Sequence, residues 1–255
     1  GLDTNTAAHV RAEITSPINL ADFKAHPLWN TPGLNKKFFR VNDIFAVKND
    51  GGGYTLFATH HWFTPECMEF RLSRTEITVD GDLVRQTGGW TKIFTATPCF
   101  PMLKEYAVGA SPFSGHLSGG RMLEFDAKHL LMTVGDQQVF EGRGVDVSQD
   151  PKVTMGKILL VDKETGDTSI FAMGERNAQG LLRDSRGRIW ETEHGPRGGD
   201  ELNLVRAGSN LGWPKVTYGV NYDARPWPGA AVDGRHDSFQ APVFAWMPSI
   251  GVTNL

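Results

Sequence analysis

Residues 180–195 read Gly-Leu-Leu-Arg-Asp-Ser-Arg-Gly-Arg-Ile-Trp-Glu-Thr-Glu-His-Gly, and this stretch decides the expected fold. Its apolar ends predict two short strands, and its Asp- and Gly-containing centre predicts the tight turn between them. The same strand–turn–strand pattern recurs at residues 43–59 and 120–135. Each second strand carries a threonine at a similar place: Thr59, Thr133 and Thr192. The recurrence indicates one structural unit that is used repeatedly.

The repeated unit favours an all-β fold built from propeller blades. Further strand-like runs fill the gaps between the hairpins, at residues 69–73, 92–95, 156–162, 168–173 and 202–205. No helix is predicted, and residues 242–250 are interpreted as the entry to another blade. The 29 glycines and 14 prolines suit many short strands joined by tight turns. Three unrelated hairpins in a β-sandwich are the alternative.

Bulk properties exclude two classes of protein. A net charge of -3 argues against a nucleic-acid binder that relies on overall electrostatic attraction. The chain has no apolar run of about 18 residues, so no membrane-spanning helix is expected. Its first residues lack the basic and apolar regions of a signal peptide. The two cysteines, Cys67 and Cys99, are interpreted either as a bridge or as two buried thiols.

A first candidate site joins the two ends of the hairpin at residues 120–135. His116 comes just before the first strand and Asp136 just after the second, so both lie at the same end of the sheet. A carboxylate that hydrogen-bonds an imidazole orients it, and an imidazole titrates near neutral pH, which suits a general base. The alternative is a turn-capping histidine and a turn aspartate that never meet.

Two further candidates lie between residues 173 and 203. Arg176, Asn177 and Gln179 precede a strand, where their side chains would grip the carboxylates or carbonyls of a cofactor. A polar loop that bridges two blades is the alternative. Residues 194–201, His-Gly-Pro-Arg-Gly-Gly-Asp-Glu, offer backbone carbonyls and carboxylates, the hard oxygen ligands that Ca²⁺ prefers. This loop lacks the ligand spacing of an EF-hand.

Taken in order, these motifs resemble the soluble sugar dehydrogenases that depend on pyrroloquinoline quinone (PQQ), the glucose/sorbosone and aldose sugar dehydrogenase family. The resemblance rests on Gly174-Glu-Arg-Asn-Ala-Gln-Gly, Glu193-His-Gly-Pro-Arg-Gly-Gly-Asp-Glu-Leu-Asn and Gly208-Ser-Asn-Leu-Gly-Trp-Pro. It is supported by His116-Leu-Ser-Gly-Gly-Arg, Val134-Gly-Asp and Trp246-Met-Pro-Ser-Ile. It is specific from about residue 116 to residue 250.

The resemblance implies a six-bladed β-propeller that binds PQQ and Ca²⁺. It implies oxidation of the C1 hydroxyl of an aldose-type sugar, or of a related sugar aldehyde, by hydride transfer to PQQ. His116 would be the general base, Asp136 would orient it, and Arg176 would donate to the quinone oxygens. The implied cofactor-binding residues are Arg176, Asn177, Gln179, His194 and Asp200. The implied Ca²⁺ ligands are the carbonyls of Gly195 and Pro196, with Glu201 at a separate structural Ca²⁺.

We expect about four blades here, in a propeller domain at residues 37–255 that follows an irregular lead-in at residues 1–36. Because a full propeller of the family needs roughly a third more chain, we expect the sequence to be a piece of a longer protein. The resemblance also implies a periplasmic or secreted enzyme with a Cys67–Cys99 disulfide, passing electrons to a quinone or redox protein. The alternative function is a cofactor-free propeller that acts as a binding or scaffold module.

Overall fold

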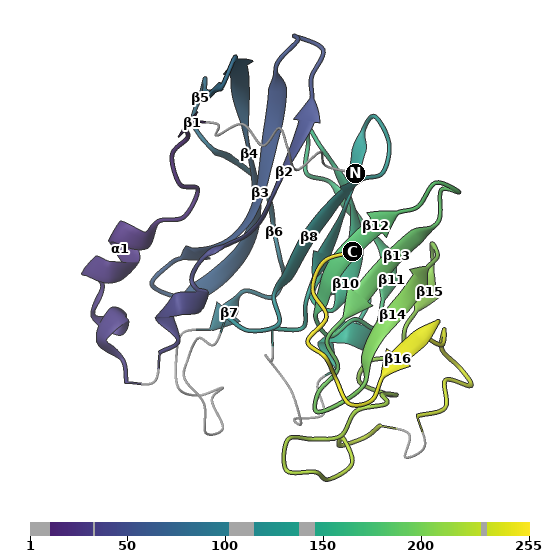
Figure 1. The fold of residues 1–255 in the computed structure, drawn as a ribbon. Coiled ribbons are helices and arrows are strands. Elements are labelled where there is room, and N and C mark those ends of the chain that lie inside the picture. The colour runs from purple at the N-terminus through teal and green to yellow at the C-terminus, as the bar shows by residue number, and fades with distance from the viewer. Residues whose placement is uncertain (1–10, 33, 102–114, 138–145, 231–233) are drawn as a thin grey trace.

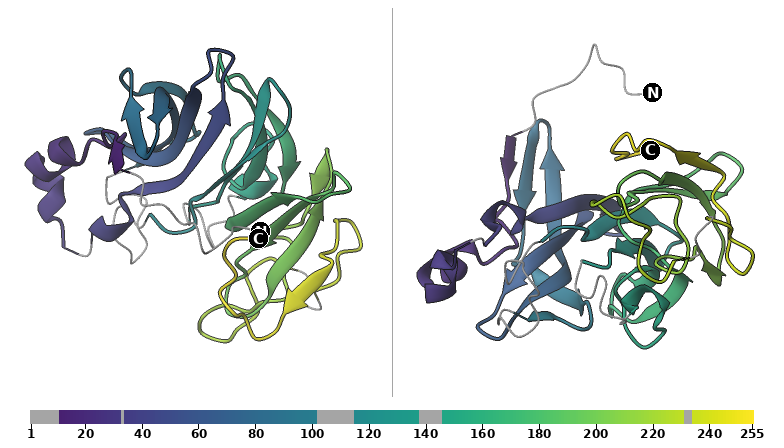
Figure 2. Two further views of the ribbon diagram at one scale, coloured as in Figure 1. Left: turned by 45° about the horizontal axis from the view of Figure 1, so that its top comes forward. Right: turned by 90° about the horizontal axis from the view of Figure 1, so that it is seen from below.

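The chain folds almost entirely into β-strands. The computed structural model describes residues 11–32, 34–101, 115–137, 146–230 and 234–255. Within these residues the strands form three sheets, which follow one another in chain order around an arc (Figures 1 and 2). The all-β expectation is therefore confirmed. None of the helices in the described segments is long and apolar enough to cross a membrane.

The expectation of no helix was wrong for one short segment of the lead-in. The helices are α1 (Leu20–Ala25) and the 3₁₀ turns η2 (Pro27–Asn30), η3 (Lys36–Phe38) and η5 (Val147–Gln149). Phe23 of α1 is buried and stacks on Phe63 at 4.6 Å between ring centroids, so tertiary packing stabilises a helix too short to be stable alone. Residues 1–10 of the expected lead-in lie outside the described residues.

The first sheet contains seven strands. They are β1 (Arg11–Glu13), β2 (Val41–Lys48), β3 (Tyr54–Phe63), β4 (Cys67–Asp80), β5 (Leu83–Gln86), β6 (Thr91–Thr95) and β7 (Phe100–Pro101). Their order is β1-β5-β4-β3-β2, and β6 and β7 also pair with β4. Cys67 at the start of β4 is bonded to Cys99, 32 residues further along the chain, which confirms the implied disulfide.

The second and third sheets repeat the hairpin of the first. The second sheet has the order β15-β11-β10-β9-β8 and the third β12-β13-β14-β16. Their strands are β8 (Gly119–Glu124), β9 (His129–Val134), β10 (Lys157–Asp162), β11 (Thr168–Met173), β12 (Ala178–Arg183), β13 (Ile189–Glu193), β14 (Asp200–Val205), β15 (Ser209–Asn210) and β16 (Phe244–Trp246). The three predicted hairpins are β2–β3, β8–β9 and β12–β13, each antiparallel.

The last strand corrects one expectation. Residues 242–250 were interpreted as the entry to another blade, but β16 pairs antiparallel with β14 and completes the third sheet. Phe244 lies opposite Leu202, so the pairing spans a long loop that local patterns do not reveal. The described residues thus form three sheets, and the number of propeller blades stays a prediction.

The first strands of the three hairpins lie next to one another, since β2 packs against β8 and β8 against β12. The repeated threonines join the sheets at this inner position. Thr59 Oγ1 donates to Gly120 O at 2.8 Å, Thr133 Oγ1 donates to Ala178 O at 3.1 Å, and Thr192 Oγ1 donates to Thr253 O at 2.6 Å. Each second strand is therefore tied to the segment that follows it around the arc.

Two apolar cores fill the spaces between the sheets. Strand β9 serves both, because successive side chains of a strand point to opposite faces. Met132 belongs to the core with Phe57 and Leu72 of the first sheet. Leu131 belongs to the core with Leu181 and Ile189 of the third sheet. These cores fix how the ends of the hairpins approach one another.

Candidate functional site

The predicted site residues His116 and Asp136 lie at the same end of the β8–β9 hairpin, as expected. Backbone pairing continues past the strands, because Gln137 N donates to Leu117 O at 3.0 Å and Gly135 N donates to Ser118 O at 3.1 Å. A Cβ on Gly135 would lie 1.9 Å from Leu117 O, so only glycine permits this close approach. A direct His116–Asp136 hydrogen bond stays a prediction.

The backbone beside these two residues is strained. Leu117 and Gln137 have φ of 54° and 56°, and they are two of three non-glycine residues with positive φ in the described segments. Such conformations are uncommon for non-glycine residues and cluster at functional sites. Gln137 Nε2 is buried and has no hydrogen-bond partner among the described residues. It is a donor available to a ligand oxygen, and sequence reasoning missed it.

The imidazole of His116 is positioned by the lead-in segment. Asn35 Nδ2 lies 3.2 Å from His116 Nε2, and the Phe38 ring meets the imidazole edge-on at 4.1 Å between centroids. Because an amide nitrogen can only donate, this contact is a hydrogen bond in the tautomer whose Nε2 carries no proton. Asn35 and Phe38 precede His116 by about 80 residues, and no sequence signal linked them to it.

Asp136 is buried and connects the second sheet to the third. Its Oδ2 accepts from Trp213 Nε1 at 2.8 Å, and its backbone N donates to Arg176 O at 2.9 Å. Trp213 lies in the long loop after β15. The indole therefore holds the carboxylate in place from that loop, a role that sequence analysis did not assign.

Arg176 extends its guanidinium into the loop that follows β13. The side chain is 1% exposed, and Nη1 donates to Gly195 O at 2.9 Å and to His194 O at 3.2 Å. The guanidinium also lies 5.2 Å from the centroid of the Trp213 ring. Trp213 is thus shared between Arg176 and Asp136, so the predicted catalytic residues of two sheets form one contiguous group.

The two predicted amides form a chain. Gln179 Nε2 donates to Asn177 Oδ1 at 2.8 Å, and the same oxygen accepts from Gly119 N at 3.2 Å. Asn177 therefore ties the start of β12 to the start of β8. The bridging role that was left open for this segment is real, and a cofactor-binding role for Asn177 and Gln179 stays a prediction.

The loop from His194 to Glu201 is stabilised from within and by the C-terminal residues. Asp200 Oδ1 accepts from Gly195 N at 3.1 Å, while Oδ2 accepts from the backbone N of Ile250, Gly251 and Val252 at 2.8–3.3 Å. His194 Nε2 contacts Val252 O. Asp200 is 2% exposed, and Pro196 is buried. The described contacts of Asp200 anchor the backbone of two segments.

Glu201 belongs to a group of buried carboxylates that sequence analysis did not recognise. Asn203 Nδ2 donates to Glu201 Oε2 at 3.2 Å and to Glu191 Oε1 at 2.7 Å. Burial and the neighbouring carboxylate of Glu193 raise the pKa of Glu201. Glu175 and Glu193 complete the group, which only the sheet pairing assembles.

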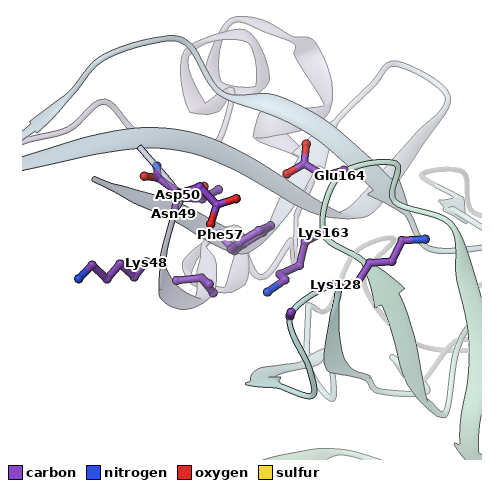
Figure 3. Close-up of a pocket in the computed structure, with 10 residues that line it drawn as sticks. Lys48, Asn49, Asp50, Phe57, Lys128, Lys163 and Glu164 are labelled. Carbon is purple, nitrogen blue, oxygen red and sulfur yellow. The ribbon is translucent and has the colours of Figure 1, made fainter. Parts of the chain in front are cut away.

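A surface pocket of about 330 Å³ lies at the other end of the hairpins. Figure 3 shows the residues that line it, with Lys48 and Asp50 from the first sheet and Lys128 and Lys163 from the second. Two of its lysines already have partners, since Lys128 Nζ lies 3.0 Å from Asp162 Oδ2 and Lys163 Nζ lies 2.8 Å from Glu124 Oε1. This pocket is separate from the residues predicted to act in chemistry.

Comparisons with known proteins agree with the motifs. The sequence model of the family described as Glucose / Sorbosone dehydrogenase matches residues 106–255. The chain is 34% identical over 160 residues to aldose sugar dehydrogenase YliI of Escherichia coli strain K12, covering 56% of this chain and 40% of that protein. It is 45% identical over 47 residues to quinoprotein glucose dehydrogenase B of Acinetobacter calcoaceticus, covering 18% of this chain and 10% of that protein.

Solved structures support the fold. The apo crystal structure of the soluble aldose sugar dehydrogenase of Escherichia coli superposes with a TM-score of 0.62 at 24% identity, covering 78% of this chain and 56% of that chain. The chain spans about 40% of the length of the aldose sugar dehydrogenase relative that it matches.

Proposed function

The chain belongs to the glucose/sorbosone dehydrogenase family, and we propose that it acts in a PQQ- and Ca²⁺-dependent sugar dehydrogenase. The proposed reaction is oxidation of the C1 hydroxyl of an aldose-type sugar, or of a related sugar aldehyde. The observation that carries the proposal is the shared contact of Trp213 with Asp136 and Arg176. It unites residues of two hairpin ends in one group, at the end of the β8–β9 hairpin where His116 also lies.

The proposed architecture is a six-bladed propeller. The inner strands β2, β8 and β12 pack in succession, as blades do around a central axis. The carbonyl of Thr253 accepts a hydrogen bond from the Thr192 hydroxyl. The carbonyls of Gly120 and Ala178 accept the equivalent bonds from Thr59 and Thr133. Thr253 thus takes the position at which β8 and β12 begin, which supports a further inner strand at this point of the arc.

The described residues fit the chemistry of PQQ, an acidic quinone with several carboxylate and carbonyl oxygens. A ligand of this kind needs cationic and neutral donors at the same place. Arg176 supplies a buried guanidinium, and Gln137 Nε2 is a buried donor without a partner among the described residues. Arg176, Asn177, Gln179, His194 and Asp200 are proposed to form the protein side of the site. When bound, PQQ would supply the two-electron acceptor for the reaction.

In this proposal His116 takes the proton of the sugar C1 hydroxyl. The neutral imidazole with a proton on Nδ1 leaves Nε2 as the basic atom, which Asn35 now occupies. A substrate hydroxyl would replace Asn35 as the donor to Nε2. Asp136, held by Trp213, would orient the group, and Arg176 would donate toward oxygens that gain negative charge.

The proposed Ca²⁺ ligands are the carbonyls of Gly195 and Pro196, with Glu201 at a structural ion. Gly195 O accepts from Arg176 Nη1, and a carbonyl oxygen has a second lone pair that can bind a cation. Arg176 therefore orients the carbonyl without consuming its capacity. Backbone carbonyls and carboxylates are the oxygen donors that suit Ca²⁺.

We further propose a periplasmic or secreted location and a quinone or redox protein as electron acceptor. The Cys67–Cys99 bond supports an oxidising compartment, where structural disulfides persist.

A titration of the full-length protein with PQQ, followed by absorbance with and without Ca²⁺, tests the proposal. We expect saturable binding of one PQQ per protein that requires Ca²⁺. Absence of binding at every Ca²⁺ concentration would favour the cofactor-free binding module instead.

A further inference from the structure

One face of the third sheet changes from apolar to acidic along its length. Ile189 and Val205 pair across β13 and β14 and belong to the core against the second sheet. Two residues further along the same face, Glu191 pairs with Asn203, and after two more Glu193 pairs with Glu201. All four of these polar residues are buried. Carboxylates that are buried on such a face need hydrogen-bond donors, protons or cations as partners.

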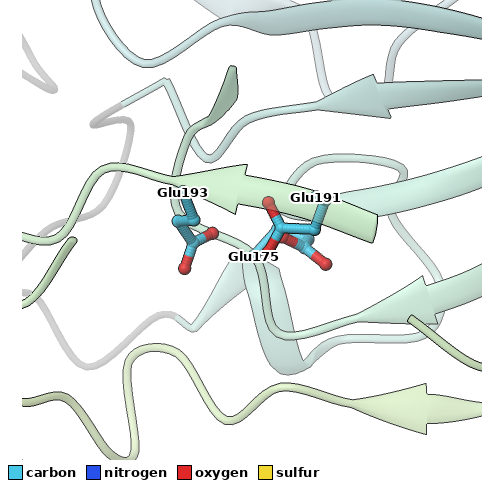
Figure 4. A group of neighbouring side chains, drawn as sticks. All are labelled: Glu175, Glu191 and Glu193. Carbon is cyan, nitrogen blue, oxygen red and sulfur yellow. The ribbon is translucent and has the colours of Figure 1, made fainter. Parts of the chain in front are cut away.

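Glu175 approaches this acidic surface from the segment before β12. One ligand oxygen each from Glu175, Glu191 and Glu193 lies within 4.8 Å of the others, and Figure 4 shows the three side chains gathered beside β13. Their exposed fractions are 0%, 0% and 5%. Solvent therefore does not compensate the three carboxylates.

Several oxygens in this cluster lack donors. Among the described residues, no N–H or hydroxyl group donates to either oxygen of Glu175 or to Oε2 of Glu191, although Glu175 and Glu193 lie close enough to share a carboxyl proton. Asn203 is independent evidence, because its Nδ2 is used by Glu191 and Glu201 while its buried Oδ1 accepts from no described group. A buried oxygen without a partner destabilises the folded protein. These oxygens therefore need a proton or a cation as a partner.

The described side-chain hydrogen bonds of the nearby cations go to backbone carbonyls, although the charges of Lys157 and Arg176 act on Glu175 and Glu193. Lys157 Nζ donates to the carbonyls of Val147, Ser148 and Met155. Arg176 bonds Glu193 Oε2 through its backbone N at 2.5 Å, while its Nη1 is directed to the 194–195 carbonyls. Burial and the neighbouring carboxylates raise the pKa of Glu175 and Glu191.

We propose that Glu175, Glu191 and Glu193 form an internal binding site for a calcium-sized divalent cation, with Asn203 Oδ1 as a further oxygen beside it. This site is distinct from the proposed Gly195–Pro196 and Glu201 positions, and it does not depend on PQQ. Oxygen atoms that all lie within 4.8 Å of one another are close enough to contact one Ca²⁺, whose bonds to oxygen are about 2.4 Å long. Mg²⁺ prefers shorter bonds and retains several waters, which a site this buried does not favour.

The ion would join two segments that carry the candidate active site, the one before β12 and strand β13. Glu175 immediately precedes Arg176, and Glu193 immediately precedes the His194 loop. Glu191 lies on β13, two residues after the core residue Ile189. Cation binding would therefore fix the position of Arg176 relative to the 194–196 loop, and its loss would loosen both.

Counting bound ions tests the site. The full-length protein, treated with EDTA and free of PQQ, is titrated with CaCl₂ by calorimetry, and bound calcium is counted by elemental analysis. The wild type is expected to bind one ion more than Glu175→Gln or Glu191→Gln. The control Glu124→Gln removes a half-exposed carboxylate outside the cluster and should match the wild type. Equal ion counts in the wild type and both cluster variants would overturn the proposal.

Thermal unfolding of the wild type and of Glu175→Gln, each measured in Ca²⁺ and in EDTA, gives a second test. At Ca²⁺ about a hundredfold above its dissociation constant, the wild type should gain roughly 5–10 °C over EDTA, and Glu175→Gln should lose most of that gain. In EDTA, Glu175→Gln should be at least as stable as the wild type, because it keeps the shape and removes a carboxyl group whose ionised form is disfavoured by burial and by the neighbouring carboxylates. If both proteins gain equally from Ca²⁺, the cluster holds shared protons and the cation site is refuted.

Discussion

The hydroxyl of Thr133 donates to the carbonyl of Ala178 at 3.1 Å, joining the second strand of one sheet to the first strand of the next. The same oxygen accepts from Gly120 N and Arg121 N, each at 3.0 Å. One buried hydroxyl thus satisfies three backbone groups at the junction between two sheets. Because His116 and Arg176 precede these two first strands, the junction sets the geometry of the candidate site.

Replacing Thr133 by valine should destabilise the protein by about 1–3 kcal/mol, since valine keeps the shape but leaves buried backbone groups unsatisfied. Urea unfolding measures the change. The control Thr91→Val alters an exposed strand residue and should stay within about 0.5 kcal/mol of the wild type. Equal stabilities of the two variants would contradict a structural role for the hydroxyl.

Removing the disulfide should also lower stability. The Cys67–Cys99 bond closes a loop with a sequence separation of 32 residues, so its loss in Cys67→Ser/Cys99→Ser should cost about 3–4 kcal/mol in the loop-entropy description. Denaturant unfolding with and without reductant checks this value. The double variant should be insensitive to reductant, whereas a wild type equally insensitive would show that the bond does not contribute.

Acid should destabilise the fold through His60. Burial lowers the pKa of His60 from 6.5 to about 4, and its ring nitrogens contact His61 O and Ser73 Oγ, each at 2.9 Å. Below pH 6.5 the unfolded chain takes up a proton that the folded chain refuses until about pH 4, so stability falls across this window. At pH 5 the loss should be roughly 2 kcal/mol.

The variant His60→Gln should flatten part of this dependence when urea midpoints are compared at pH 7 and pH 5. His129→Gln is the control, because His129 is only half-buried and pairs with Asp126. An unchanged slope in His60→Gln would argue against the buried imidazole as the cause. The variant should still retain some dependence, since burial also lowers the pKa of His61.

Asp200 should act first as an anchor for the C-terminal segment. In Asp200→Asn one oxygen and the negative charge are lost, so the backbone N–H groups of residues 250–252 lose a charged acceptor, at a cost of about 1.5–3 kcal/mol. Amide hydrogen exchange should accelerate at those three positions. The exposed control Asp237→Asn should leave their exchange unchanged. Unaltered exchange in Asp200→Asn would contradict the anchor.

Local signals were enough to predict the three hairpins. Turn residues such as Asn49 and Asp184 lie between alternating strands, and Asn49 Oδ1 and Asp184 Oδ1 accept backbone N–H groups in their turns. The same signals place His116 and Asp136 at one hairpin end. These features depend on neighbours close in sequence, which the printed residues reveal.

Long-range contacts could not be predicted in the same way. Strand β16 joins β14 across a loop of about 40 residues, Asn35 reaches His116, and Trp213 reaches Asp136. The carboxylate cluster needs the pairing of β13 with β14 before Glu175 has neighbours. No periodicity or motif specifies such approaches, because they follow from how whole sheets pack.

The most direct test of the proposed function is sugar-dependent dye reduction by the full-length protein reconstituted with PQQ and Ca²⁺, measured for the wild type, His116→Ala and the control His129→Ala. Loss of a general base should lower kcat of His116→Ala at least about a hundredfold while PQQ binding persists. His129→Ala should keep wild-type turnover. No turnover by the reconstituted wild type, or equal turnover by His116→Ala, would contradict the account.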